Sequence, residues 1–260
     1  YEVFKIYEPK EREIYKLPYF PDRVCHHALM NILEPIFVKT FINTTFNCIK
    51  NRGIMGAHRA IVKALKDKQN TIYCLKLDIK KFYPNIDNEI LKKLLRKKFK
   101  DYNLLKILDE IIDSTVGVPI GNYLSQYFAN FYLTYFDHWI KENKNVKYYF
   151  RYCDDIVILH SDKEYLHKLF KEIQEYLDIN LKLSIKLNYQ IFPVDVRGID
   201  FVGYKFRHTY ILLRKSIKRR FIKMMIYNKN KKSIASYNGW LKYCNSINLQ
   251  FKYLKNENTK

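Results

Sequence analysis

Residues 148–160 read "YYFRYCDDIVILH", in which two adjacent acids, Asp154 and Asp155, interrupt an aromatic and aliphatic stretch. The apolar runs on either side favour two strands joined by a tight turn, because aspartate is common in turns. A structural hairpin is one explanation for the acidic pair. A metal site is the other, and the rest of the sequence bears on the choice.

A third acid, Asp78, ends a predicted strand upstream. In "TIYCLKLDIKKFYPNID" the residues from Ile72 to Leu77 alternate as in a strand that delivers Asp78 at its end. If this strand neighbours the hairpin in one sheet, the three acids converge at one edge. Clustered carboxylates raise each other's pKa unless cations compensate, and such hard oxygen ligands select Mg²⁺. Two ions about 3.5–4 Å apart would activate a 3′-hydroxyl and stabilise leaving pyrophosphate, which is nucleotidyl transfer.

Helical patterns separate and follow these strands. Asp87 is predicted to cap an amphipathic helix over "NEILKKLLRKKF", and "GNYLSQYFANFYLTYF" predicts a buried helix that begins at Gly121. "SDKE" at 161–164 fits a Ser-x-x-Glu capping box before a third helix. Residues 181–191 and 199–206 have the pattern of short strands. This order predicts an α+β fold, a sheet backed by helices.

The charge is strongly positive and uneven. The 260 residues include 47 Lys and Arg against 26 Asp and Glu, a net charge of +21. From Lys205 to Lys260 there are 15 basic residues and one acid, Glu257, which gives +14 of that total. A basic face gains affinity for polyanions by releasing counterions, so nucleic acid is the expected partner.

Cysteines and hydropathy restrict the compartment. The 5 cysteines are scattered singly, which argues against a disulfide framework and a zinc site. We see no run of about 18 uncharged apolar residues and no secretory signal, so we expect no membrane partner and a cytoplasmic location.

The motifs in this order resemble those of reverse transcriptases over nearly the whole chain. "LDIKKFYPNID" is similar to the first catalytic motif, "GVPIGNYLSQYFANFYL" to the nucleotide-pocket motif, "YCDD" to the Tyr-x-Asp-Asp box and "GIDFVGYKF" to the primer-gripping hairpin. "EPKEREIYKLPYFPDRVCHHALMNILEPIF" and "NRGIMGAHRAI" are similar to fingers motifs. The resemblance implies a right-hand polymerase fold: fingers at 1–71, a ferredoxin-like palm of antiparallel sheet and helices at 72–206 (with 88–116 partly fingers), and a helical thumb at 207–260.

The resemblance also implies a catalytic set. Asp78, Asp154 and Asp155 would hold two Mg²⁺ ions, with Mn²⁺ as a substitute, and Ile79 is counted among the metal-binding residues. Tyr83 matches the steric gate against the 2′-hydroxyl of ribonucleotides. Core packing is the alternative for this ring, and the two roles can coexist.

Further residues are implied in nucleotide binding. Gly121 would let the backbone approach the incoming base pair. Arg52, or Lys50 in its place, would meet the triphosphate or template base, with a solvated loop charge as the alternative. Lys186 is the candidate that protonates pyrophosphate, and Lys182 fits almost as well. The nucleotide-binding set is Tyr83, Ile120, Gly121, Gln126, Arg52 and Lys186.

Primer and template contacts fall mainly on the hairpin after the palm. The resemblance assigns them to Tyr152, Phe201, Gly203, Tyr204, Arg214 and Lys215. Trp240 is expected to pack in the thumb core and not on the duplex.

One motif points to a branch of the family. Ile120 precedes the motif glycine and Ser125-Gln126 follows it, as in reverse transcriptases of diversity-generating retroelements, a bacterial group related to those of group II introns and retrons. Those enzymes copy a template-repeat RNA with errors at adenines and work with a small basic accessory protein. An aliphatic side chain at Ile120 removes a hydrogen-bonding handle near the nascent pair, which makes lower fidelity plausible.

The sequence therefore predicts an RNA-directed DNA polymerase. Its partners would be an RNA template, a DNA or RNA primer and dNTPs, together with the accessory protein and a dedicated structured RNA. One rival is a related domesticated reverse transcriptase in antiviral defence. The other is a non-catalytic RNA-binding relative that keeps the fold.

Overall fold

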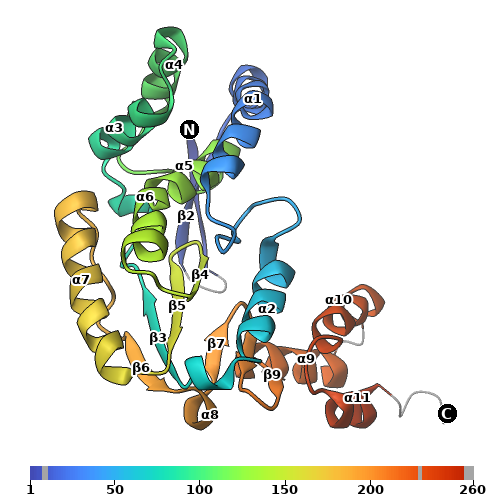
Figure 1. Ribbon diagram of the computed structural model, residues 1–260. Helices are drawn as coiled ribbons and strands as arrows, with labels where there is room; N and C mark the ends of the chain where they lie inside the picture. Colours follow the sequence, from blue (N-terminus) through green and yellow to red (C-terminus); the bar gives the residue numbers. More distant parts are fainter. Residues whose placement is uncertain (8–10, 228–229, 255–260) are drawn as a thin grey trace.

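A four-stranded antiparallel sheet forms the centre of the molecule (Figure 1). This computed structural model describes residues 1–7, 11–227 and 230–254; the start of the first fingers motif, at 8–10, and Glu257 lie outside the described residues. The strands lie in the order β4-β5-β3-β6. Their bounds are Tyr73–Asp78 for β3, Tyr148–Tyr152 for β4, Asp155–His160 for β5 and Gln190–Pro193 for β6.

The connections give this sheet the β-α-β-β-α-β topology of ferredoxin-like folds. β3 runs antiparallel to β5 and β6, and Asp78 stands opposite Asp155 in the register with β5. Cys153 and Asp154 form the turn between β4 and β5, with Cys153 in the left-handed region at φ 59°. The predicted strand, the hairpin and the α+β sheet are confirmed.

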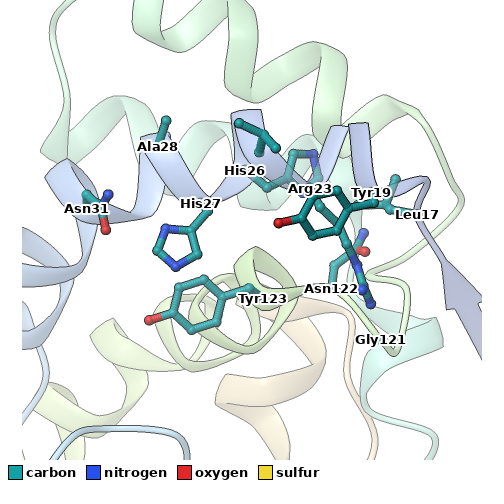
Figure 2. Close-up of a pocket in the computed structure, with 11 residues that line it drawn as sticks. Leu17, Tyr19, Arg23, His26, His27, Ala28, Asn31, Gly121, Asn122 and Tyr123 are labelled. Carbon is teal, nitrogen blue, oxygen red and sulfur yellow. The ribbon is translucent and has the colours of Figure 1, made fainter. Parts of the chain in front are cut away.

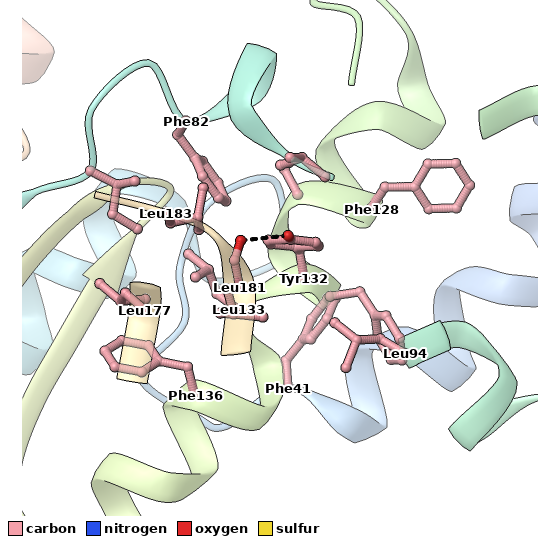
Figure 3. Packing of buried hydrophobic residues seen from close by; sticks show 14 of the residues in the cluster. Phe41, Phe82, Leu94, Phe128, Tyr132, Leu133, Phe136, Leu177, Leu181 and Leu183 are labelled. Atoms are coloured by element: carbon pink, nitrogen blue, oxygen red, sulfur yellow. Dashed lines mark hydrogen bonds between the residues drawn. The ribbon is translucent and has the colours of Figure 1, made fainter. Parts of the chain in front are cut away.

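Three helices cover one face of the sheet. Leu75 of β3 and Ile158 of β5 belong to a buried core with residues of these helices, part of which Figure 3 shows. The Tyr132 hydroxyl donates a hydrogen bond to the Leu181 carbonyl oxygen over 2.7 Å and so ties two of them together. The helices are α5 (Tyr123–Tyr132), α6 (Thr134–His138) and α7 (Lys163–Leu181).

A helix and a small second sheet cover the other face. Cys74 and Val157, which alternate with the residues above, belong to a second core with Ile61 of α2. That core includes a three-stranded antiparallel sheet of order β7-β8-β9. The bounds are Gly53–Ala64 for α2, Ile199–Phe201 for β7, Tyr204–Phe206 for β8 and Ile211–Leu213 for β9.

The remaining long helices lie at the two ends of the molecule, and the N-terminal pair of strands reaches from one of these ends toward the middle (Figure 1). The Asp87 carboxylate accepts from the Ile90 amide at 3.0 Å, which confirms the predicted cap of α3. One group comprises β1 (Glu2–Ile6), β2 (Arg12–Lys16), α1 (Val24–Thr40), α3 (Asn88–Lys98) and α4 (Tyr102–Asp113). The other comprises α9 (Lys215–Tyr227), α10 (Lys231–Leu241) and α11 (Ile247–Tyr253). Short helical turns occur at Tyr19–Arg23, Lys68–Asn70, Tyr83–Asn85, Trp139–Asn143 and Val194–Arg197.

Two local predictions were wrong. Asp162, and not Ser161, caps α7, because its carboxylate accepts from the Glu164 and Tyr165 amides. Residues 181–191 are mostly not strand: α7 ends at Leu181, and Ile185 makes only an isolated bridge to Ile79 before β6 begins.

Candidate active site

Three carboxylates meet at one end of β3 and β5. Asp78 is the last residue of β3, Asp155 is the first of β5, and Asp154 lies in the turn that precedes it. The Ile79 amide donates to the Asp154 carbonyl oxygen at 3.2 Å, and the Lys186 amide donates to the Asp78 carbonyl oxygen at 2.8 Å. Backbone hydrogen bonds therefore fix the strand end and the turn beside each other.

Burial and mutual repulsion disfavour the charged forms of these acids. Burial, together with the charges of Asp78 and Asp154, raises the pKa of Asp155 to about 6, although Lys76 opposes the shift. Burial and then the Asp78 charge raise the pKa of Asp154. Oδ1 of Asp155 is buried without a hydrogen-bond partner. The cluster therefore favours a cation beside it.

Two lysines provide positive charge in this structure. Lys186 forms an ion pair with Asp78 through its Nζ. Nζ of Lys76 lies 3.3 Å from Oδ2 of Asp155 and also donates to the Asp200 carbonyl oxygen on β7. Lys76 was not predicted as a site residue from the sequence. Its position two residues before Asp78 on the same strand, and hence on the same face, was the available signal.

The donor set suits Mg²⁺, but its arrangement is not that of a closed metal site. Among the residues that the structure describes, no group of three or more His, Cys, Asp or Glu is placed to hold a metal ion. Three carboxylates with one unsatisfied buried oxygen are nevertheless the ligands that Mg²⁺ prefers. The Ile79 side chain is buried in the core, so only its backbone carbonyl could contribute to a metal site.

Tyr83 lies beside the aspartate turn. Cys153 Sγ donates to the Tyr83 hydroxyl at 3.7 Å, and the Val118 amide donates to the Tyr83 carbonyl oxygen at 3.0 Å. Burial, followed by the neighbouring Cys153, raises the pKa of Tyr83, so its hydroxyl stays protonated. The ring packs against the main core as well, as the packing alternative expects, and the gate role stays a prediction.

Gly121 packs against the backbone of β2, at a position where the sequence predicted close approach of the incoming base pair. Its φ is 127°, and a Cβ there would lie 2.6 Å from the Tyr15 carbonyl oxygen. The Tyr15 amide in turn donates to the Ile120 carbonyl oxygen at 2.8 Å. In this structure the glycine is therefore required by the close approach of β2. Gln126 lies half-buried in α5.

Arg52 has a structural bonding pattern. Its Nη1 donates to the carbonyl oxygens of Ile42 at 2.7 Å and Thr45 at 3.1 Å, and burial lowers its pKa. The alternative of a solvated loop charge was wrong for Arg52, because the guanidinium holds the loop before α2. Lys50 is exposed.

The two rings of the predicted primer hairpin are core residues. Phe201 is 0% exposed and Tyr204 is 1% exposed, so the prediction that these side chains contact primer or template was wrong. A Cβ at Gly203 would clash with Cζ3 of Trp240. The Trp240 ring also packs against Tyr204, with centroids 5.4 Å apart, so it joins the C-terminal helices to the hairpin.

The other predicted primer contacts remain accessible. Arg214 donates through Nε to Oδ1 of Asp200 at 2.6 Å, and its amide donates to the Gly203 carbonyl oxygen at 2.9 Å. Lys215 is exposed at the start of α9. Tyr152, half-buried, pairs with Asp155 at the end of β4.

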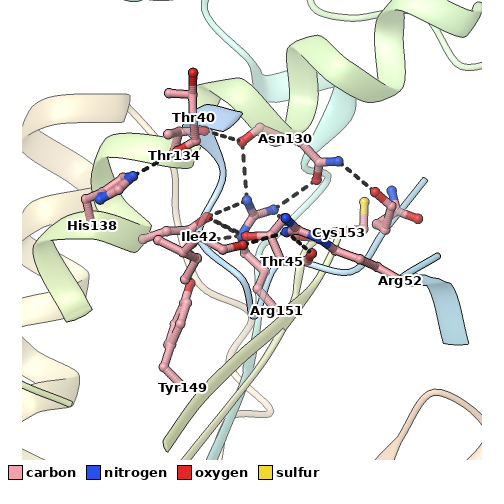
Figure 4. Close-up of polar contacts among 12 residues, drawn as sticks. Thr40, Ile42, Thr45, Arg52, Asn130, Thr134, His138, Tyr149, Arg151 and Cys153 are labelled. Carbon is pink, nitrogen blue, oxygen red and sulfur yellow. Dashed lines mark hydrogen bonds and ion pairs between the residues drawn. The ribbon is translucent and has the colours of Figure 1, made fainter. Parts of the chain in front are cut away.

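A buried ion pair that was not predicted from the sequence hydrogen-bonds to the turn between β4 and β5. Arg151 and Asp137 are both 0% exposed, with Arg151 Nη2 2.6 Å from Asp137 Oδ2. Arg151 Nη1 also donates to the Cys153 carbonyl oxygen at 3.0 Å (Figure 4). Thr45 and Tyr149 donate to the same Asp137 carboxylate. An arginine inside the apolar strand "YYFRY" was the only sequence signal.

Comparison with known proteins gives a family and a fold. The sequence profile described as "Reverse transcriptase (RNA-dependent DNA polymerase)" matches residues 9–206. Protein YkfC of Escherichia coli is 21% identical over 249 residues, covering 77% of this chain and 65% of that protein. The "Uncharacterized 91 kDa protein in cob intron" of Schizosaccharomyces pombe is 25% identical over 192 residues, covering 69% of this chain. The chain thus spans 65% and 23% of the lengths of these two relatives.

Solved structures of telomerase have the same fold. Telomerase of Candida tropicalis in complex with a fragment of telomeric RNA matches with a TM-score of 0.63 and 12% identity, over 88% of this chain and 49% of that one. The corresponding complex from Candida albicans matches with a TM-score of 0.57 and 11% identity, over 86% and 50%. The architecture is therefore that of a right-hand polymerase. In the described ranges, no helix is both long and apolar enough to cross a membrane.

Proposed function

The chain belongs to the reverse transcriptase family of RNA-dependent DNA polymerases, and on that premise we propose that it extends a primer 3′-hydroxyl with dNTPs on an RNA template. The observation that carries the proposal is the register that sets Asp78 opposite Asp155, with Asp154 in the adjoining turn. An unrelated hairpin turn would not need a third carboxylate at the end of the neighbouring strand.

Asp78, Asp154 and Asp155 would hold two Mg²⁺ ions, with Mn²⁺ as a substitute. When bound, such ions would supply Lewis-acid activation of the 3′-hydroxyl and charge stabilisation for the leaving pyrophosphate. Lys76 pairs with Asp155 and Lys186 pairs with Asp78, and the raised pKa of Asp155 follows from the burial of that carboxylate. Ile79 would take part only through its backbone carbonyl.

Lys186 is the proposed proton donor to pyrophosphate. It lies against Asp78, whereas the alternative, Lys182, pairs with Asp87 at 2.7 Å. Tyr83 is the proposed gate against ribonucleotides, with Cys153 and Val118 holding it in place. Ile120 and Gly121 in the turn before α5, Gln126 within α5 and Arg52 just before α2 would contribute to the nucleotide pocket.

The residues proposed to contact the primer–template duplex are the predicted ones that are accessible at the surface. The backbone of the β7–β8 hairpin at Gly203, together with Tyr152, Arg214 and Lys215, would contact the primer strand and its phosphates. We assign residues 1–71 to fingers, 72–206 to palm, with 88–116 partly fingers, and 207–260 to thumb. The basic C-terminal part then faces the nucleic acid, which is consistent with 15 basic residues from position 205 onward.

A finer assignment is the retroelement type. The Ile-Gly-x-x-x-Ser-Gln motif from Ile120 to Gln126 supports a role in copying a template-repeat RNA, with a small basic accessory protein and a dedicated RNA as partners in the cytoplasm. Sequencing of cDNA made from co-purifying RNA would report the template, the priming site and the errors together. Substitutions concentrated at template adenines are expected, and errors spread evenly over all four bases would contradict this type.

Primer extension tests the polymerase assignment. The protein, a labelled primer annealed to RNA, dNTPs and Mg²⁺ should give full-length cDNA, and Asp154→Asn should abolish extension while leaving primer–template binding intact. Tight RNA binding by the wild-type chain without incorporation in Mg²⁺ or Mn²⁺ would replace the proposal with a non-catalytic RNA-binding role.

A further inference from the structure

The loop of residues 41–52, which precedes α2, docks along the outer edge of β4. The Arg151 amide donates to the Thr44 carbonyl oxygen at 3.0 Å, and the Phe46 amide donates to the Arg151 carbonyl oxygen at 3.0 Å. The loop thereby pairs with backbone groups that an edge strand otherwise leaves open. Cys48 in this loop has φ 54°, a conformation that costs a non-glycine residue free energy and persists where surrounding contacts impose it.

The side-chain amide of Asn130 links this loop to the buried Arg151 side chain (Figure 4). Its Nδ2 donates to the Asn47 carbonyl oxygen at 2.8 Å, and its Oδ1 accepts from Arg151 Nη1 at 3.2 Å. Asn130 is 1% exposed, so losing either bond leaves a buried polar group without a partner. A carbonyl oxygen only accepts and a guanidinium only donates, so the amide fits in one orientation alone.

Arg151 extends the link to the turn between β4 and β5. Its Nη1, which donates to Asn130, also donates to the Cys153 carbonyl oxygen at 3.0 Å. Its Nη2 donates to the backbone carbonyl oxygen of Asn130 at 3.2 Å, so the planar guanidinium has little freedom to turn. Cys153 immediately precedes Asp154. A continuous path of hydrogen bonds therefore runs from the 41–52 loop through Asn130 and Arg151 to the aspartate turn.

The helix α5 is a firm platform for Asn130. At the start of this helix the Tyr123 ring faces the His27 ring of α1, with centroids 5.9 Å apart (Figure 2). The Tyr127 hydroxyl donates to Oε1 of Glu34, also on α1, at 2.7 Å. Asn130 lies about two turns beyond the start of α5. The helix therefore holds the Asn130 backbone in place, so that its side chain can fix the loop and the turn relative to each other.

We propose that Asn130 is a positioning residue, which couples the docking of the 41–52 loop to the placement of Asp154. It acts through Arg151 and the Cys153 carbonyl oxygen, and not on the substrate. The inference rests on the proposed function, since Asp154 is a proposed metal ligand. When the coupling is lost, the turn moves relative to the end of β3, and misplacing a reacting group by about 1 Å can cost about 100-fold in rate.

Hydrogen exchange in EDTA tests the coupling without metal or catalysis. The Phe46 amide reports on the loop, and the Ile79 amide, which donates to the Asp154 carbonyl oxygen, reports on the turn. In Asn130→Ala both amides should exchange faster by about tenfold or more, because the buried link between the two segments is removed. Asn130→Asp keeps an acceptor for Arg151 and loses only the donor to the loop, and it should accelerate both amides as well.

Asn88→Ala is the matched control. Asn88 Nδ2 also donates to two backbone carbonyl oxygens, those of Ile112 at 2.9 Å and Thr115 at 2.8 Å, but these contacts join α3 to the end of α4 and the residues after it. The control should leave both reporter amides at their wild-type exchange rates. Thermal melting verifies that each variant folds, and Asn130→Asp, which conserves the size of the side chain, decides the test if Asn130→Ala does not fold.

Single-turnover addition of one dNTP separates positioning from a general loss of folded protein. The amplitude counts the active molecules, and the rate constant at saturating dNTP reports on each of them. We expect the rate constant to fall by about tenfold or more in both Asn130 variants, with an unchanged primer–template Kd and a wild-type rate constant in Asn88→Ala. A lower amplitude or melting temperature with a wild-type rate constant in the Asn130 variants would mean a purely structural role and would overturn the proposal.

Independent behaviour of the two reporter amides would overturn it too. Faster exchange at Phe46 with wild-type exchange at Ile79 means that the loop and the turn move separately. Failure of the proposed function is a different outcome. A wild-type protein that extends no primer, but whose reporter amides respond together, would keep the coupling and lose the polymerase assignment, and one that extends primers while the amides respond separately would do the reverse.

Discussion

Three cationic side chains, Lys76, Lys186 and Arg151, balance the acids around the turn between β4 and β5. The aspartates themselves could be predicted from the sequence, because strand alternation and the Asp-Asp pair indicate which residues end each strand. Their partners could not. Asp137 pairs with Arg151 from a helix 14 residues away, and spacing alone does not show which acid faces a buried arginine.

Replacing Arg151 should destabilise the protein around the turn between β4 and β5. Arg151→Met leaves Asp137 as an uncompensated buried charge, so the free energy of unfolding should fall by about 3–5 kcal/mol in a denaturant titration. Arg96→Met, which removes a surface partner of Asp109, is the control and should change little. Equal, small effects of the two substitutions would show that the buried pair is not required.

Tyr83 gives a second prediction at this scale. Tyr83→Ala should raise incorporation of ribonucleotides relative to deoxynucleotides, because the ring that would clash with a 2′-hydroxyl is removed. Tyr83→Phe keeps the ring and should keep the discrimination. The ratio of kcat/KM for rNTP and dNTP, measured in single-nucleotide extension, checks both. An unchanged ratio in Tyr83→Ala would leave Tyr83 as a packing residue only.

At the scale of elements, sequence periodicity predicted helices and strands but not the contacts between segments that are far apart in the chain. Periodicity predicted β3, α3 and the α5 helix, because each has a strong alternation or apolar stripe. It did not predict that Gly121 packs closely against Tyr15 of β2 or that Gly203 packs against the Trp240 ring. Both contacts join segments far apart in the chain. The resemblance to the primer-gripping hairpin assigned primer contacts to Phe201 and Tyr204. Periodicity could not correct this, because a short strand buried on both sides has no distinguishing period.

His58 joins α2 to the C-terminal helices and should make that contact sensitive to pH. Its Nε2 donates to the Tyr243 carbonyl oxygen at 2.8 Å, and burial, with a smaller effect of Arg59, lowers its pKa from 6.5. As the pH falls, His58 detached from Tyr243 therefore takes up a proton at a higher pH than His58 in the packed contact. Stability of the contact is full above pH 6.5 and is lost as the pH falls through the lowered pKa.

Hydrogen exchange at the amides around Tyr243 measures this effect. Exchange corrected for its intrinsic pH dependence should accelerate between pH 7.5 and 5.5 in the wild type. His58→Gln keeps an amide donor without a titrating ring and should give nearly constant protection. A wild-type profile as flat as that of His58→Gln would contradict the role of His58.

At the scale of the whole molecule, the fold class and the uneven charge were accessible from the sequence. An α+β sheet backed by helices is what the order of patterns predicted, and its topology agrees with right-hand polymerases at 12% identity. The contact between α1 and α5 could not be predicted from the sequence, because it depends on how helices far apart in the chain pack together. The net charge of +21 indicates polyanion binding without revealing which nucleic acid is bound.

The central claim is that Asp78, Asp154 and Asp155 together carry RNA-templated DNA synthesis. Its most direct test is single-turnover addition of one dNTP to a primer on RNA, comparing the wild type with Asp78→Asn, Asp154→Asn and Asp155→Asn. Asp113→Asn, at a surface carboxylate with 53% exposure, is the control. We predict addition by the wild type and the control, and none by the three site variants despite unchanged template binding. Wild-type rates in any of the three would contradict the account.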